Sequence, residues 1–172
     1  IMSGLTLVLI AWVLAKVPDY PGQSAHERMP LRRVFHTPGV RRVLAVVIAW
    51  MLAHNMLYTY IAPFLAVAGL GDRTDLVLLV FGVASLLGIW IVGVLIDRHL
   101  RTLALASTLL FGLAASVLAV AGEAPALVYI AIGIWGVAFG GAPTLFQTAL
   151  AKTAGDEAAD VAQSMLCLLY TS

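Results

Sequence analysis

Four long apolar runs without a single Asp, Glu, Lys or Arg limit what this chain can fold into. They occupy residues 43–67, 76–96, 103–121 and 126–149. A helix needs roughly 20 mainly apolar residues to cross the hydrocarbon core of a membrane, which is about 30 Å thick. Backbone that faces lipid must also satisfy its own hydrogen bonds, which a helix does and an open sheet does not. The sequence therefore predicts an all-α, polytopic membrane helix bundle with four complete spans.

The composition supports a membrane protein and excludes several other classes. Hydrophobic residues make up 62% of the 172 residues and charged residues 11%, with a mean hydropathy of +0.99. Soluble domains are about 45–50% apolar and about 25% charged. A net charge of +1, without a basic face, argues against nucleic-acid binding. The single cysteine, Cys167, permits no internal disulfide and no cysteine-based metal cluster.

The sequence also lacks the common catalytic motifs. It contains no G-x-x-x-x-G-K-[ST] phosphate loop, no H-E-x-x-H pair and no Ser/His/Asp arrangement. We therefore expect neither an enzyme nor an ATP-driven pump, and no catalytic residue, metal or cofactor.

The remaining segments are shorter or more polar than the four runs. Residues 1–17 form a partial span, and residues 160–170 look like the start of another. Residues 18–42 form the only long polar segment, with four prolines and five arginines, so a continuous helix is not expected there. Residues 31–36 could form one amphipathic turn on the membrane surface, or belong to an ordinary basic linker.

The positions of lysine and arginine predict the orientation of the spans. If residues 18–42 lie in the cytoplasm and the spans alternate, nine of the ten basic residues are cytoplasmic. Only Arg73 then faces the opposite side. Because cytoplasmic loops carry an excess of Lys and Arg, this asymmetry favours that orientation.

A short charged stretch separates the second and third runs. Residues 93–101 read Gly-Val-Leu-Ile-Asp-Arg-His-Leu-Arg, so Asp97, Arg98 and Arg101 must lie where a span ends and water begins. A carboxylate there can complement the dipole of a neighbouring helix. It can also form paired hydrogen bonds with an arginine, which one conformation keeps and another breaks.

Taken as G-x-L-x-D-R-x-x-R, this stretch resembles the loop signature of the major facilitator superfamily of transporters. Two further stretches are similar to the bacterial drug and sugar efflux branch of that family. One is Tyr-Thr-Tyr-Ile-Ala-Pro-Phe-Leu at residues 58–65, preceded by His54. The other is Trp-Gly-Val-Ala-Phe-Gly-Gly-Ala-Pro-Thr at residues 135–144, running on through Gln147 to residues 163–165.

The resemblance implies a place for each segment in a twelve-helix transporter. Residues 1–17 would end the last helix of the N-terminal half, and residues 18–42 would be the cytoplasmic central linker. Residues 43–166 would form four complete transmembrane helices of the C-terminal half and the start of a fifth. The fold would then need the other half and the last helices. Residues 167–172 do not resemble the family, and we expect a non-native tail there.

The resemblance also implies a function. It implies a secondary active transporter in the bacterial cytoplasmic membrane, an antiporter that exports small organic solutes such as drugs or sugars in exchange for protons. The stretch at residues 93–101, with Gly93, Asp97, Arg98 and Arg101, would act as a cytoplasmic conformational latch. The alternative for this stretch is a solvated turn whose arginines only obey the orientation rule.

Polar residues inside two of the spans are the candidates for a transport cavity. At about 100° per residue, His54, Asn55 and Tyr58 share one helix face, with Thr59 at its flank. Thr144 and Gln147 repeat the pattern in the last complete span. Because exposure to lipid is costly, these side chains must face water or another helix. They could therefore line one cavity or form only interhelical hydrogen bonds.

Two further expectations follow from residue types inside the spans. No complete span has a carboxylate at its centre, so His54 is the titratable candidate for proton coupling. Small residues let membrane helices approach closely, so we expect close packing at Gly82, Ser85 and Gly93 on one side of one span and at Gly136 and Gly140 in another. If the spans serve assembly alone, the protein would be a non-transporting membrane subunit or receptor.

The predicted orientation can be tested by thiol labelling in the complete protein. With Cys167 replaced by serine, Ser24→Cys and Thr102→Cys should both react with an impermeant thiol reagent from the cytoplasmic side, because residues 18–42 and 97–101 share that side. Reaction of the two cysteines from opposite sides of the membrane would contradict the topology.

Overall fold

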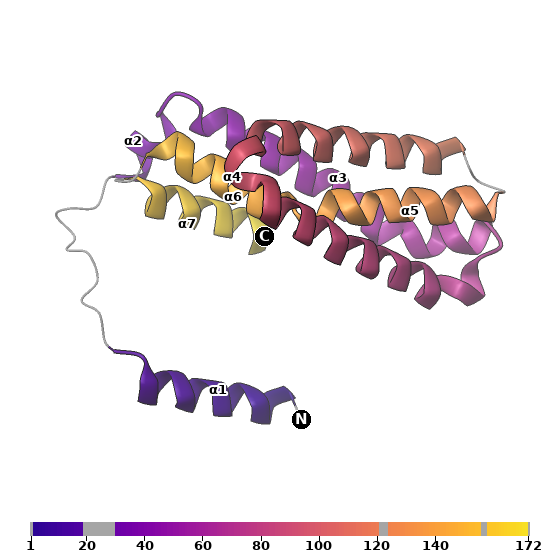
Figure 1. Cartoon of the computed structure of the whole chain (residues 1–172), viewed down its shortest axis with the longest axis horizontal. Helices are drawn as coiled ribbons and strands as arrows, with labels where there is room; N and C mark the ends of the chain where they lie inside the picture. Colours follow the sequence, from indigo (N-terminus) through magenta and orange to yellow (C-terminus); the bar gives the residue numbers. More distant parts are fainter. Residues whose placement is uncertain (1, 19–29, 121–123, 156–157, 172) are drawn as a thin grey trace.

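All of the described secondary structure is helical, which confirms the predicted all-α bundle. The computed structural model describes residues 2–18, 30–120, 124–155 and 158–171 (Figure 1). The helices in chain order are α1 (Met2–Lys16), α2 (Leu31–Phe35), α3 (Val40–Val67), a short 3-10 helix η1 (Gly71–Arg73), α4 (Thr74–Val120), α5 (Pro125–Gly140), α6 (Ala142–Ala154) and α7 (Ala159–Thr171).

Within the described residues, three helical stretches are long and apolar enough to cross a membrane. They are Val40–Val67, Gly71–Val120 and Pro125–Ala154. The stretch of 50 residues is far longer than one crossing needs. It folds back on itself near His99, whose backbone angles of φ −130° and ψ 29° leave the helical range. Figure 1 shows the resulting two arms of α4, which contain the second and third predicted runs.

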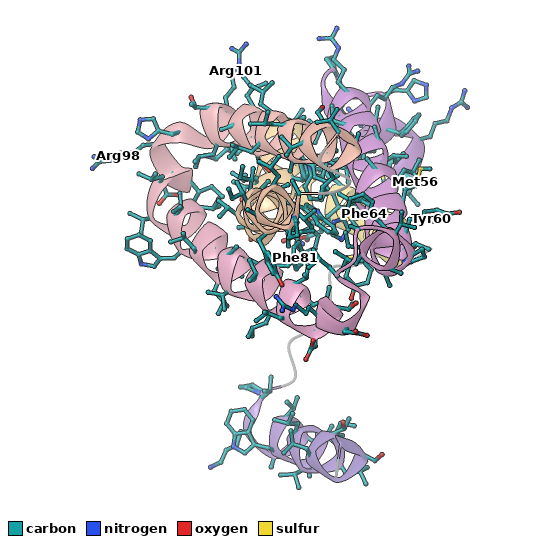
Figure 2. The ribbon with its side chains drawn as sticks, turned by 90° about the vertical axis from the view of Figure 1, so that its right-hand side faces the viewer. Met56, Tyr60, Phe64, Phe81, Arg98 and Arg101 are labelled. Carbon is teal, nitrogen blue, oxygen red and sulfur yellow. The ribbon has the colours of Figure 1, made fainter. Side chains whose placement is uncertain are left out.

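Helix α5 lies at the centre of the bundle. Viewed along the helices, it is surrounded by the two arms of α4 and by α3 (Figure 2). Its buried residues lie along one broad side of the helix, at about 100° per residue: Val128, Ala131, Ile132, Trp135, Gly136 and Ala138. Because α5 is apolar all round, it can bury this broad side against several helices while Leu127 and Ile130 stay exposed.

Close contact between α4 and α5 depends on glycines. A Cβ added at Gly136 would meet the carbonyl oxygen of Phe81, and one added at Gly140 would meet the carbonyl oxygen of Ser85. From the other helix, Gly88 faces the carbonyl of Val137 in the same way. The prediction of close packing at Gly136 and Gly140 is therefore confirmed.

The same prediction is wrong for Gly82 and Gly93. No heavy atom lies within 4 Å of a Cβ built at either position, and both residues are exposed. The reason is rotational: Gly88 follows Gly82 by six positions, and at about 100° per residue this places the two glycines on different sides of the helix. Both glycines are small enough for close packing, but their positions in the sequence do not show which side of the helix meets α5.

The outer surface of the bundle is apolar. Met56 and Tyr60 point away from the bundle on α3, whereas Phe81 points towards α5 (Figure 2). Large exposed apolar side chains also cover the first arm of α4, including Leu79, Leu86 and Trp90. Such a surface is expected where helices meet lipid. Helix α1 lies apart from the bundle (Figure 1) and is exposed along residues 3–16.

A comparison of glycine substitutions tests the α4–α5 contact. Gly136→Ala and Gly140→Ala should lower the stability of the complete protein by about 1–3 kcal/mol, because each new methyl group overlaps the backbone of α4. Gly82→Ala is the matched control, and it should leave stability unchanged or raise it by up to about 1 kcal/mol, because alanine favours helix. Thermal unfolding in one detergent measures all three, and equal effects at Gly82 and Gly140 would contradict the packing.

Candidate functional site

His54 lies on the buried face of α3, where it contacts α5. Only 7% of its surface is exposed. The indole Nε1–H of Trp135 donates a hydrogen bond to His54 Nδ1, with an N–N distance of 3.2 Å. In a neutral imidazole one ring nitrogen accepts and the other carries the hydrogen. The bond from Trp135 therefore places the hydrogen of neutral His54 on Nε2.

Aromatic rings enclose His54 from three helices. The ring of Phe139 on α5 stacks on it, with centroids 4.0 Å apart. On α3, Trp50 and Tyr58 lie one helical turn to either side, at centroid distances of 5.7 and 6.0 Å. Phe81 of α4 lies at 6.5 Å. We call these rings, together with Trp135, the aromatic cluster.

Trp50 connects this cluster to the second arm of α4 and to α6. Its ring lies 5.2 Å from that of Phe111 on the second arm of α4 and 5.7 Å from that of Phe146 on α6. Its own Nε1–H is buried and has no hydrogen-bond partner among the described residues. His54 and Trp50 thus join α3 to α4, α5 and α6 through ring contacts and a single side-chain hydrogen bond.

The other polar candidates lie at the surface of the described helices. Tyr58 is 52% exposed, although its ring also contacts His54. Asn55 and Thr59 on α3, and Thr144 and Gln147 on α6, are exposed. Helices α3 and α6 pack against each other. The backbone carbonyl of Gln147 accepts a hydrogen bond of 2.9 Å from Gln163 Nε2 on α7, so the exposed amide of Gln147 stands beside a helix junction.

The charged stretch forms the bend between the two arms of α4. Gly93, Asp97, Arg98 and Arg101 are all exposed. Arg98 and Arg101 point away from the bundle (Figure 2). Asp97 has no ion-pair partner among the residues that the structure describes. The bend therefore presents one carboxylate and two guanidiniums that the described helices leave unpaired.

Comparison with known proteins identifies the family. A family model described as the Major Facilitator Superfamily matches residues 1–171. The chain belongs to the major facilitator superfamily. It is thus a multi-pass membrane protein, as the apolar runs and the spanning helices indicate.

Curated relatives of this major facilitator protein carry the name purine ribonucleoside efflux pump NepI. The protein from Escherichia coli strain K12 is 27% identical over 154 residues, which are 88% of this chain and 39% of the relative. The protein from Escherichia coli O157:H7 is 26% identical over 158 residues, 91% of this chain and 40% of the relative. The chain therefore spans about two fifths of the length of these relatives. No solved structure gives a significant match.

Several residues of this major facilitator site were not predicted from the sequence. Trp135 and Phe139 fix the position of His54, and Trp50 joins it to the core. A usable signal was present, since Trp50 precedes His54 by four residues and Trp135 precedes Phe139 by four. Residues at that spacing lie on one helix face. A buried indole N–H also needs an acceptor, and His54 offers one.

One polar contact outside the cluster was also missed. The buried Ser107 on the second arm of α4 donates a hydrogen bond of 2.8 Å to the carbonyl oxygen of Ala138 on α5. This bond holds the second arm against the central helix near Phe139. Among the described residues, no group of three His, Cys, Asp or Glu side chains could hold a metal ion.

Proposed function

We propose that this chain is part of a secondary active transporter that exports small organic solutes across the bacterial cytoplasmic membrane in exchange for protons. Membership of the family and the efflux function named for the relatives support the proposal. The observation that carries it is the exposure of Asn55, Thr59, Thr144 and Gln147 within spanning helices. Polar side chains at that depth are costly against lipid, so they need water, solute or another helix.

The chemistry of the cavity candidates suits a solute with a ring and several polar groups. Tyr58 offers a half-exposed ring, and its neighbours offer hydroxyl and amide groups. Such sites combine apolar and aromatic walls with a few placed polar groups. The relatives are named for purine ribonucleosides, which have both features. A purine nucleoside is therefore the first substrate to test, beside drugs and sugars.

The second candidate function is assembly without transport. In that case the same polar side chains would hydrogen-bond to a helix of another subunit, as polar groups in membrane helices often do. The two functions differ in whether water reaches Asn55 and Gln147 in the complete protein.

We propose that Asp97 and the arginines of the α4 bend act as a latch during alternating access. All three side chains are exposed and the two arginines point away from the bundle (Figure 2), so their partners must come from outside the described helices. A carboxylate paired with a helix terminus or an arginine in one conformation would stabilise that conformation alone.

We further propose that His54 couples proton binding to transport. Protonation of Nδ1 would remove the acceptor that Trp135 uses, because both nitrogens of a charged imidazole are donors. The hydrogen bond between α3 and α5 would then be lost. A proton on this nitrogen thus changes the contact between the central helix and a helix of the proposed cavity.

Transport by variants of the complete protein tests the proposed cavity. Asn55→Leu and Gln147→Leu should lower efflux of a purine nucleoside roughly tenfold at equal protein abundance, because polar groups that contact solute are lost. Met56→Leu is the matched control, since Met56 neighbours Asn55 but points away from the bundle. Its activity should stay at the wild-type level. Wild-type efflux by all three variants would contradict a cavity at these residues.

The latch is tested by Asp97→Asn, which keeps the size of the side chain and removes its charge. We expect transport to fall about tenfold, with normal membrane insertion, because the charge-assisted contact is lost. Asp72→Asn, an exposed carboxylate in η1, should have little effect. If Asp97→Asn transports like the unmodified protein, Asp97 is only a solvated residue of the bend.

The role of His54 is tested by the pH dependence of transport. His54→Gln removes the titrating group, and Trp135→Phe removes the donor to Nδ1 while keeping an aromatic ring. Both should change the pH profile of transport at matched expression. Trp90→Phe is the control, because Trp90 is exposed on α4. Superimposable profiles for His54→Gln and the wild type would leave His54 with a packing role alone.

A further inference from the structure

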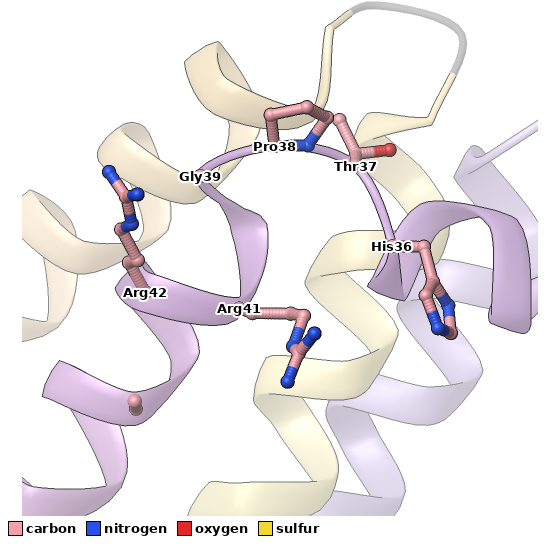
Figure 3. Close-up of a pocket in the computed structure, with 7 residues that line it drawn as sticks. His36, Thr37, Pro38, Gly39, Arg41 and Arg42 are labelled. Atoms are coloured by element: carbon pink, nitrogen blue, oxygen red, sulfur yellow. The ribbon is translucent and has the colours of Figure 1, made fainter.

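We propose that the cytoplasmic end of α3 binds the phosphate group of an anionic phospholipid. A cleft of about 710 Å³ lies where the connection from α2 enters α3 (Figure 3). We call it the basic cleft. It is lined by His36, Thr37, Pro38, Gly39, Arg41, Arg42 and Ala45. The proposal does not depend on what the protein transports.

The charged side chains that line the basic cleft, Arg41 and Arg42, are both basic. Residues 30–42 contain four arginines and no acidic residue. Arg41 and Arg42 also lie in the first turn of α3, which has no acidic residue. The helix dipole places partial positive charge at that end, so arginines are unfavourable there and an anion is favourable. A phosphate bound at Arg41 would offset both the dipole and the charge of that guanidinium.

Arg41 is held in a position to bind. The central carbon of its guanidinium lies 5.6 Å from the ring centroid of Phe35 on α2. Such stacking on a ring face leaves the N–H groups at the edge of the guanidinium free for an anion. In Figure 3, Arg41 and His36 extend to the same side of the connection, and Arg42 extends to the other side. The N–H of Val40 already donates to the carbonyl of Thr37, so the first turn of α3 adds the backbone N–H groups of Arg41 and Arg42 as donors.

The connection itself is shaped by Gly39. Its φ of +98° is one that residues with side chains rarely adopt, and a Cβ there would overlap the side chain of Thr153 on α6. This glycine lets the chain turn directly from α2 into α3 beside α6. Phe35 and Arg41 are thereby brought together.

The surroundings favour a lipid over a soluble anion. Leu31 and Phe35 on α2 are 57% and 42% exposed, next to the exposed Arg32 and Arg33. Apolar and basic side chains together at the end of a spanning helix suit the boundary between lipid headgroups and acyl chains. The cytoplasmic leaflet supplies anionic headgroups at that depth. The phosphate would bind in the basic cleft, while Leu31 and Phe35 contact the upper part of the acyl chains.

Native mass spectrometry of the complete protein tests this proposal. The protein is extracted from bilayers that contain phosphatidylglycerol and phosphatidylcholine, and the lipids that stay bound are counted. We expect phosphatidylglycerol to be retained preferentially. Arg41→Gln should lower its apparent affinity about tenfold, because a charge-assisted hydrogen bond is lost. Arg33→Gln removes the same charge from α2 outside the cleft and should lower it about twofold at most.

Two further measurements separate charge from geometry at Arg41, and a lipid from a soluble anion. Arg41→Lys keeps the charge but loses the planar fork, and it should show an intermediate affinity. The Arg41→Lys variant also tests the proposal if the Arg41→Gln variant does not fold. Inorganic phosphate is added to lipid-depleted protein in a separate titration. Equal losses in Arg41→Gln and Arg33→Gln, or no preference for phosphatidylglycerol, would overturn the proposal. Binding of inorganic phosphate that depends on Arg41, without lipid retention, would assign the cleft to a soluble anion and would also overturn it.

Discussion

The close approach of α4 and α5 is the contact on which the rest of the bundle depends. Between helices in lipid there is little hydrophobic drive, so association depends on dispersion and on how near two backbones can come. Gly136 and Gly140 on one helix and Gly88 on the other remove the side chains that would keep the backbones apart. With α5 fixed against α4 in this way, its side chains Trp135 and Phe139 can contact His54 of α3.

The same contact positions the candidate site. Trp135 and Phe139 lie in the part of α5 that contains the packed glycines. The contact of α5 with α4 therefore sets where their rings meet His54. The result is a polar group inside an aromatic cluster, next to exposed polar side chains on α3 and α6. In the proposed transporter, protonation of His54 would therefore alter the contact between α5 and α3, which carries part of the proposed cavity. If α5 were not held against α4, the loss of this contact would not affect the position of the neighbouring helices.

Much of the fold could be predicted from the sequence because the membrane imposes strict rules on it. Residues 76–96 and 103–121 had to be helical, since lipid offers their backbone no other partner. The charges of Asp97, Arg98 and Arg101 marked the reversal that the structure places at His99. The family resemblance rested on those same residues, and the match to the superfamily confirms it.

The sequence alone did not show how each helix is rotated about its own axis, and therefore which of its sides is buried. Gly82 and Gly88 are equally small, and only the packing decides that Gly88 meets α5. Likewise, His54, Asn55 and Tyr58 share a helix face by spacing, yet His54 is buried and Asn55 is exposed. Neighbouring residues on a helix differ in direction by about 100°, which is enough to place one in the core and the next at the surface. The hydrogen bond from Trp135 joins residues 81 positions apart, so no local pattern could predict it.

The central claim is that the exposed polar side chains of α3 and α6 face water in the complete protein. Solvent accessibility of single cysteines tests it most directly. With Cys167 replaced by serine, Asn55→Cys and Gln147→Cys should react with a charged, water-soluble thiol reagent, and substrate should slow both reactions. Met56→Cys, one residue from Asn55 but pointing out of the bundle, should not react. Protection of Asn55→Cys and Gln147→Cys, with or without substrate, would mean that these residues pack against another helix and that no cavity exists there.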